Sequence, residues 1–162
     1  MVMLSQFNGA VMDSARRYRF LLWRFWNDSP RVLFIGLNPS TANELQDDPT
    51  VKRWTGFARD WGYGGFFATN LYPFITPDPK ELVVPSCYHK ANYPSIQMAS
   101  SLSVLTVACW GDGIKKIPNG KIVAEHVRAT YLIAPMCFGL TASGNPKHPL
   151  YLSRNAQLTE YP

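Results

Sequence analysis

The sequence contains few cysteines and no pattern typical of a metal centre. Cys87, Cys109 and Cys137 are odd in number and widely spaced, and they form no Cys-x-x-Cys pair. This spacing supports neither a structural zinc site nor an iron–sulfur cluster, so we expect no metal and no cofactor. Cys109 and Cys137 lie in apolar runs, where a cysteine typically packs as a small core residue in a reducing cytoplasm.

Long apolar runs and a high charge density are also missing. No stretch approaches the roughly 20 apolar residues of a membrane span, and the sequence shows no signal peptide pattern. We therefore expect a cytoplasmic protein without a membrane partner. Charged residues make up only 17% of the chain and hydrophobic residues 46%, which excludes a disordered protein. The net charge of +5 permits a nucleic-acid partner without requiring one.

Several catalytic motifs and every form of repetition are absent. The sequence contains no serine nucleophile elbow, no phosphate-binding P-loop, no His-Glu-x-x-His motif and no glycine triplet of the dinucleotide-binding type. It also lacks internal repeats and low-complexity segments. A length of 162 residues suits a single domain with a sizeable core, so we expect one domain over residues 1–162 and a monomer.

The sequence does contain short apolar runs that end at glycines, prolines or amides. Such runs are typical of strands buried on both faces of a sheet. We expect four of them, at residues 31–37, 65–71, 102–110 and 131–137.

The N-terminal part has a weaker pattern. Basic and apolar side chains alternate loosely over residues 16–26, and the turn at residues 27–30 then leads into the first buried run. This pattern favours a strand that forms a hairpin with residues 31–37, with a short helix as the alternative. Residues 1–13 show little pattern and are expected to be a loose arm.

Helical patterns separate the buried runs. Asp48 and Pro49 are typical of an N-cap and a first helical position, and an apolar stripe follows as far as residue 61. Further helices are expected at residues 90–101 and 121–129, and prolines make residues 72–85 and 144–154 irregular. Helices between parallel strands cover both faces of the sheet. The expected fold is thus a three-layer α/β/α sandwich around a central, mainly parallel four-stranded sheet, plus an N-terminal β-hairpin strand.

Polar residues follow the ends of the predicted strands. Asn38 and Ser40 follow the first, Asn70 ends the second, Trp110 to Asp112 end the third, and a loop with His148 follows the fourth. Ligands of open α/β sheets bind at these ends. Amides can contact the edges of bases, and histidine can stabilise a developing anion. The alternatives are ordinary capping residues and a histidine in a surface loop.

Two charged clusters have similar alternatives. Asp47 and Asp48 supply a possible acid to a pocket, but an N-cap with an acidic neighbour is the favoured interpretation. The basic residues before the first buried run are candidates for phosphate contact, although a solvated face is favoured. They are Arg16, Arg17, Arg19 and Arg24.

The motif order carries a family resemblance. The segments VLFIGLNPSTA, DDPTVKRW, WGYGGFFATNLYPF, PDPKEL, VACWGDG and GNPKHPLYLS resemble the DUF1643 family over roughly residues 17–155. That family in turn looks like a distant branch of the uracil-DNA glycosylase superfamily. In that superfamily a GLNPG-type motif, a strand ending in Asn, a WG strand end and a final HPSPLS-type loop surround a base flipped from DNA.

The superfamily resemblance implies roles for individual residues. Asn38 would position the attacking water, Asn70 would read the Watson–Crick edge, and His148 would stabilise the oxyanion of the leaving base. Leu150 or Tyr151 would wedge into the duplex. The same resemblance implies a base pocket and DNA contacts at Gly36, Leu37, Pro39, Ser40, Trp110, Asn145, Lys147 and Arg154.

Three functions remain open at this point. The first is a metal-independent DNA glycosylase acting on uracil or a modified base, with DNA as the partner. The second is a nucleic-acid or nucleotide-binding module without turnover, because the amide of Asn38 cannot act as a general base. The third is a hydrolase or transferase of free nucleosides or nucleotides.

Overall fold

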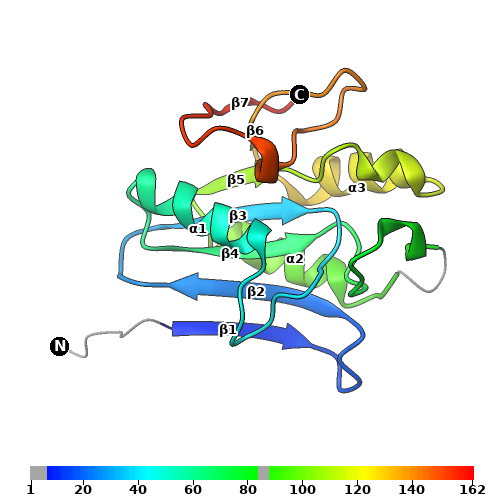
Figure 1. Cartoon of the computed structure of the whole chain (residues 1–162), viewed down its shortest axis with the longest axis horizontal. Coiled ribbons are helices and arrows are strands. Elements are labelled where there is room, and N and C mark those ends of the chain that lie inside the picture. The colour runs from blue at the N-terminus through cyan, green and yellow to red at the C-terminus, as the bar shows by residue number, and fades with distance from the viewer. Residues whose placement is uncertain (1–6, 84–87) are drawn as a thin grey trace.

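A mixed β-sheet runs through the middle of the computed structural model, which describes residues 7–83 and 88–162 (Figure 1). In these residues the sheet has seven strands in the order β1-β2-β4-β3-β5-β6-β7. Their bounds are Phe7–Met12 (β1), Arg19–Phe25 (β2), Arg31–Gly36 (β3), Gly65–Asn70 (β4), Leu105–Ala108 (β5), Met136–Cys137 (β6) and Thr159–Glu160 (β7).

Strand direction determines which chain ends meet at one edge of the sheet. β4, β3, β5 and β6 pair in parallel, whereas β1, β2 and β7 pair antiparallel with their neighbours. The α/β class is confirmed. The expected four-stranded sheet was too small, because the antiparallel strands extend it on both sides and make it mixed.

The N-terminal pairing differs from the predicted hairpin. β2 pairs with β1 and β4, not with β3, because both edges of β3 are already occupied by β4 and β5. The prediction of a loose arm over residues 1–13 was also wrong where it can be compared: residues 7–12 form β1, and residues 1–6 lie outside the described part.

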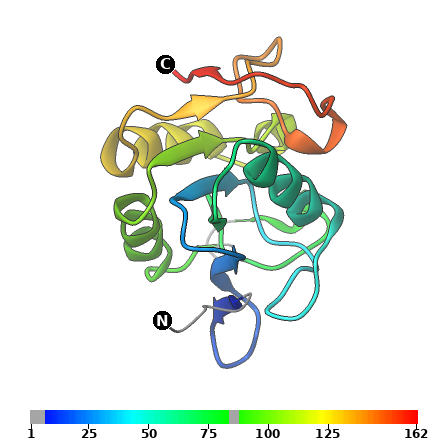
Figure 2. The ribbon, with the colours of Figure 1, turned by 90° about the vertical axis from the view of Figure 1, so that its left-hand side faces the viewer.

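Helices cover both faces of the sheet, as predicted (Figure 2). α1 (Pro49–Asp60) lies on one face, and α2 (Asn92–Ser101) and α3 (Gly120–Tyr131) lie on the other. The predicted start of α1 is confirmed, since Oδ1 of Asp48 accepts a hydrogen bond from the backbone N–H of Val51 at 2.8 Å and Pro49 is the first helical residue.

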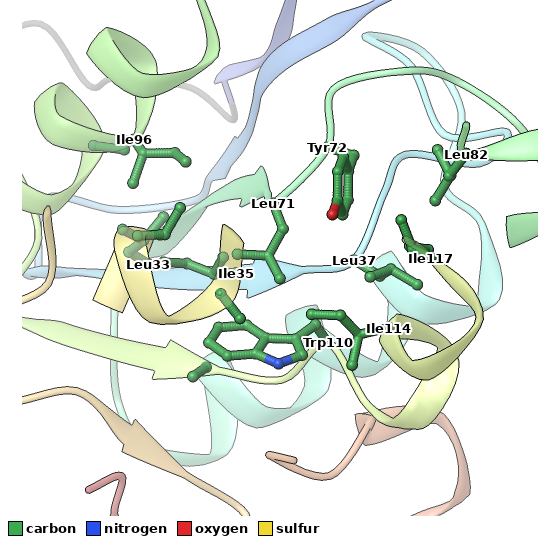
Figure 3. Packing of buried hydrophobic residues seen from close by; sticks show 14 of the residues in the cluster. Leu33, Ile35, Leu37, Leu71, Tyr72, Leu82, Ile96, Trp110, Ile114 and Ile117 are labelled. Atoms are coloured by element: carbon green, nitrogen blue, oxygen red, sulfur yellow. The ribbon is translucent and has the colours of Figure 1, made fainter. Parts of the chain in front are cut away.

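The apolar run in β3 fills both layers because consecutive strand residues point to opposite faces. Phe34 packs on the α1 side, where its ring stacks on that of Trp54 with centroids 5.5 Å apart. Leu33 and Ile35 point to the other side, toward Ile96 of α2 (Figure 3). The buried strands are therefore covered on both faces, and the polar strand ends are left for a site.

The last two predicted strands are shorter than expected. β5 covers only residues 105–108, and α3 continues to Tyr131, so β6 is reduced to Met136–Cys137. Cys109 and Cys137 are buried, as predicted, and Cys87 lies outside the described residues. Within the described ranges, no helix has both the length and the apolarity needed to cross a bilayer.

Candidate functional site

A cavity of about 710 Å³ opens at the edge where the parallel strands end. It lies between the ends of β3, β4 and β5, the start of α1 and the loop that carries His148. The structure brings most of the predicted site residues to its lining, namely Gly36, Leu37, Asn38, Ser40, Asp48, Asn70, Trp110, Lys147, His148, Leu150 and Tyr151. Pro39, Asp47, Asn145 and Arg154 do not line it.

The amide of Asn70 lies directly over Gly36. A Cβ atom on residue 36 would be 2.8 Å from Nδ2 of Asn70, so glycine leaves the room that this amide occupies. Oδ1 of Asn70 accepts a long hydrogen bond of 3.4 Å from Nη2 of Arg19. The amide is therefore held with its oxygen toward Arg19 and its N–H donors toward the end of β3.

The amide of Asn38 is oriented by two backbone carbonyls. Its Nδ2 donates to the oxygens of Pro39 at 2.9 Å and Thr76 at 2.8 Å. Both amide hydrogens are thereby engaged, and Oδ1 has no partner among the described residues. Asn38 is thus arranged to accept a hydrogen bond from a water or a ligand, but an amide oxygen is too weakly basic to remove a proton. Pro39 contributes through its backbone, not through the cavity lining.

The proton of His148 is placed by its own loop. Nδ1 accepts a hydrogen bond from the backbone N–H of Leu150 at 3.2 Å, at the start of a 3₁₀ helix formed by Pro149–Tyr151. In the neutral ring the proton is then on Nε2. Burial lowers the pKa of His148, against the opposing charge of Asp48, so the ring is neutral at pH 7 and offers an N–H donor.

Glycine and arginine fix the position of this histidine loop. Gly111 has a φ of 71°, and a Cβ atom there would lie 2.9 Å from the Cβ of His148, so the loop packs directly on the backbone after β5. Nε of Arg53, on α1, donates to the oxygen of Pro149 at 3.3 Å, and its Nη2 donates to the oxygen of Leu152. The loop is therefore fastened to the helix whose N-cap also lines the cavity.

The two neighbouring aspartates have different environments. Asp48 is 9% exposed, caps α1 and lines the cavity. Asp47 is exposed and pairs with Nε of Arg24 at 2.8 Å, outside the lining. Of the two predicted acids, only Asp48 lies at the cavity.

Asp112, which the sequence analysis placed at the third strand end without giving it a role, also lines the cavity. Its Oδ1 accepts hydrogen bonds from Oγ1 of Thr141 at 2.7 Å and Nδ2 of Asn145 at 2.8 Å. These bonds hold the pKa of the Asp112 carboxyl below its usual range. Asn145, predicted to contact the base, does not line the cavity and instead donates its hydrogen bond to Asp112. The signal that pointed to this residue was its position directly after the Trp-Gly strand end.

Arg19 also lines the cavity, although a solvated face was favoured for the basic cluster. That prediction is wrong for Arg19 and Arg24, which are 2% and 4% exposed, while Arg16 and Arg17 are exposed. Because β2 runs antiparallel to β4, its first residue lies at the edge where β4 ends. The alternation of basic and apolar residues carries no information on this placement.

The predicted DNA-contact residues do not all lie at the cavity. Tyr151 is 88% exposed at the cavity, beside the exposed Lys147 and the partly buried Leu150. Arg154 does not belong to this group, since Nε and Nη2 donate to the Asp60 carboxylate at 2.7 and 2.8 Å on another part of the surface. This ion pair accounts for its position away from the cavity.

The fold and this cavity define an α/β protein with a polar site at the carboxyl ends of its parallel strands. The sequence model of the family described as "Protein of unknown function (DUF1643)" matches residues 19–150. The chain belongs to this family. No curated protein and no solved structure matches it. Within residues 7–83 and 88–162, no three His, Cys, Asp or Glu side chains gather as a set of metal ligands.

Proposed function

We propose that the cavity binds a nucleobase flipped from DNA and hydrolyses its N-glycosidic bond. The observation that carries this proposal is the hydrogen bond from the N–H of Leu150 to Nδ1 of His148, which puts the donor proton of a neutral ring on Nε2 at a cavity that also contains Asn38 and Asn70. A volume of about 710 Å³ lies within the range of small-molecule sites.

The reaction requires a donor for the leaving base and an oriented water. As the bond between C1′ and the base nitrogen breaks, its electron pair moves to the base, and negative charge develops on a base oxygen. Nε2–H of His148 donates to that oxygen, and such a pre-placed donor is worth about 10²–10³ in rate. A water oriented by Oδ1 of Asn38 forms the new bond to C1′ and releases its proton to solvent, from which the base anion is protonated.

The mouth of the cavity supports DNA as the partner. A base reaches a pocket only after leaving the stack, which requires contacts with both the backbone and the neighbouring bases. Lys116 and Lys147 are exposed lining residues suited to phosphate, and the exposed ring of Tyr151 is suited to stacking or wedging against bases.

A binding module without turnover is the second candidate. Asn38 favours it, because an amide at the water position cannot remove a proton. The cavity lining contains the carboxylates of Asp48 and Asp112, but Oδ1 of each already accepts hydrogen bonds within the protein.

Excision assays on labelled oligonucleotides test the proposal. The substrates carry uracil, deaminated purines or bulky modified pyrimidines, and alkali converts abasic sites to strand breaks. We expect cleavage of at least one substrate, with large losses for Asn38→Ala and Asn70→Ala. His126→Ala, an exposed histidine on α3, is the control and should retain the activity.

The same protein samples distinguish the candidates. Absence of cleavage, together with binding that weakens steeply as salt rises, would refute the glycosylase and support the binding module. Absence of both cleavage and binding would refute a DNA partner.

A further inference from the structure

Arg19 places a buried positive charge at the cavity without a contacting carboxylate. Its Nη1 donates to the backbone oxygen of Ala42 at 2.8 Å, and its Nη2 makes the long bond to Asn70. A guanidinium has five N–H donors. In the described part of the chain, Nε has no partner and no ion pair includes Arg19.

Arg24, on the same strand, shows how the protein treats a buried arginine elsewhere. Its Nε pairs with Asp47 at 2.8 Å, and its Nη groups donate to the backbone oxygens of Trp23 at 2.9 Å and Asn43 at 2.6 Å. Arg19 has no such contact. Burial lowers its pKa to about 10, against the opposing charge of Asp48, so it remains charged at neutral pH. A buried charge is costly unless a counter-charge accompanies it.

The cavity lining contains more basic than acidic side chains. Lys116 and Lys147 also line it, and neither takes part in an ion pair within the described ranges. The lining carboxylates of Asp48 and Asp112 are already engaged by hydrogen bonds from the protein. Arg19, Lys116 and Lys147 therefore outnumber Asp48 and Asp112 by one charge, and this excess of positive charge favours a negatively charged ligand.

We propose that Arg19 binds an anionic oxygen group of the ligand, a carboxylate or a phosphate, beside the base edge that Asn70 contacts. The planar guanidinium matches the geometry of both groups. That the ligand contains a nucleobase rests on the proposed function, whereas the inference that it carries an anionic group rests on the charges of the cavity lining. Two sources supply this chemistry: a carboxylate on a modified pyrimidine, or the phosphate of a nucleotide.

Calorimetric titration of the full chain tests the inference with five probes: uracil, thymine, 5-carboxyuracil, deoxyuridine monophosphate and inorganic phosphate. Thymine is the neutral control for a substituent at the ring. Since a hydrogen bond to a charged group is stronger than one between neutral groups, we expect an anionic probe to bind about tenfold or more tightly than uracil and thymine.

Variants of Arg19 test whether this side chain causes the preference for anionic probes. Arg19→Met should abolish it, and Arg19→Lys should retain only part, because lysine keeps the charge but loses the planar fork. Arg24→Lys is the matched control, since Arg24 is equally buried on the same strand but paired and outside the lining. Thermal unfolding of each variant shows whether it is folded, and if Arg19→Met is not, Arg19→Lys carries the comparison.

The outcomes separate the sources and the two proposals. An Arg19-dependent preference for 5-carboxyuracil supports the base carboxylate, and one for the monophosphate or inorganic phosphate supports the phosphate. Equal binding of neutral and anionic probes, or a preference that survives loss of Arg19, overturns the inference. Excision without anion preference refutes only the role of Arg19, and anion preference without excision refutes only the glycosylase.

Discussion

Replacing His148 by asparagine separates the two hydrogen-bonding roles of this side chain. The Oδ1 atom of asparagine can take the place of Nδ1 and keep the bond from Leu150, while nothing replaces Nε2. If Nε2–H stabilises the leaving base, the excision rate should fall about 10²–10³-fold, equivalent to about 2.7–4 kcal/mol of transition-state stabilisation. The free energy of unfolding should hardly change.

Two further substitutions calibrate this result. His148→Ala removes both hydrogen bonds, so it should lose the same excision rate and, in addition, about 1 kcal/mol of stability. His148→Gln extends an amide donor toward the position of Nε2, so it should recover part of the rate. The order of rates is therefore wild type, glutamine, then asparagine and alanine together.

Single-turnover excision on the best oligonucleotide substrate measures the rate, and urea unfolding at pH 7.5 measures the stability. His126→Ala serves as the control for loss of an imidazole. Full activity in His148→Asn would refute the assignment of Nε2–H as the donor. An asparagine variant as unstable as the alanine variant would refute the role of Nδ1 in holding the loop.

Three other substitutions and one change of pH give sharp expectations. Gly36→Ala should reduce excision about tenfold or more, because the new Cβ displaces the Asn70 amide, whereas circular dichroism should show an unchanged fold. Since burial lowers the pKa of His148, the unfolded state binds the proton of this histidine more readily than the folded state. The free energy of unfolding of the wild type should therefore fall relative to that of His148→Asn as the pH drops below the ordinary value of 6.5. Urea unfolding of both proteins at pH 7.5 and pH 5 measures this, and an equal change in the free energy of unfolding in the two proteins would refute it. Arg53→Ala should speed hydrogen exchange in the loop that carries His148, and unchanged exchange would show that this loop needs no anchor on α1. Trp54→Ala should cost about 3–5 kcal/mol in urea unfolding, because the ring is buried against Phe34; a loss below 1 kcal/mol would contradict that packing.

Local signals in the sequence identified the parts of the fold that depend on local chemistry. Asp48 and Pro49 gave the start of α1, because capping involves neighbouring residues, and the run from Val32 to Ile35 gave β3. The partners of β2 were not predicted. An apolar pattern shows which residues are buried, but not which strand edge they meet across the sheet.

In the candidate site, too, local features were predicted from the sequence and features that depend on distant segments were not. Residues at the ends of parallel strands were expected to gather, and Asn38, Asn70 and His148 line one cavity. A solvated face was wrongly favoured for Arg19, because its position depends on the antiparallel course of β2, and Asp112 was noted at its strand end without being given a role. Both residues are charged, and the burial and pairing of a charged side chain depend on segments that are distant in the sequence.

Strand β1 has a consequence for the strand that supplies the buried arginines. It pairs along the outer edge of β2 and shields the backbone N–H and C=O groups there from pairing with another chain. β2 itself provides Arg19 to the cavity and Arg24 to the ion pair with Asp47. β1 therefore takes the outer position in the sheet, and β2, which supplies these two arginines, is protected from pairing with a strand of another molecule.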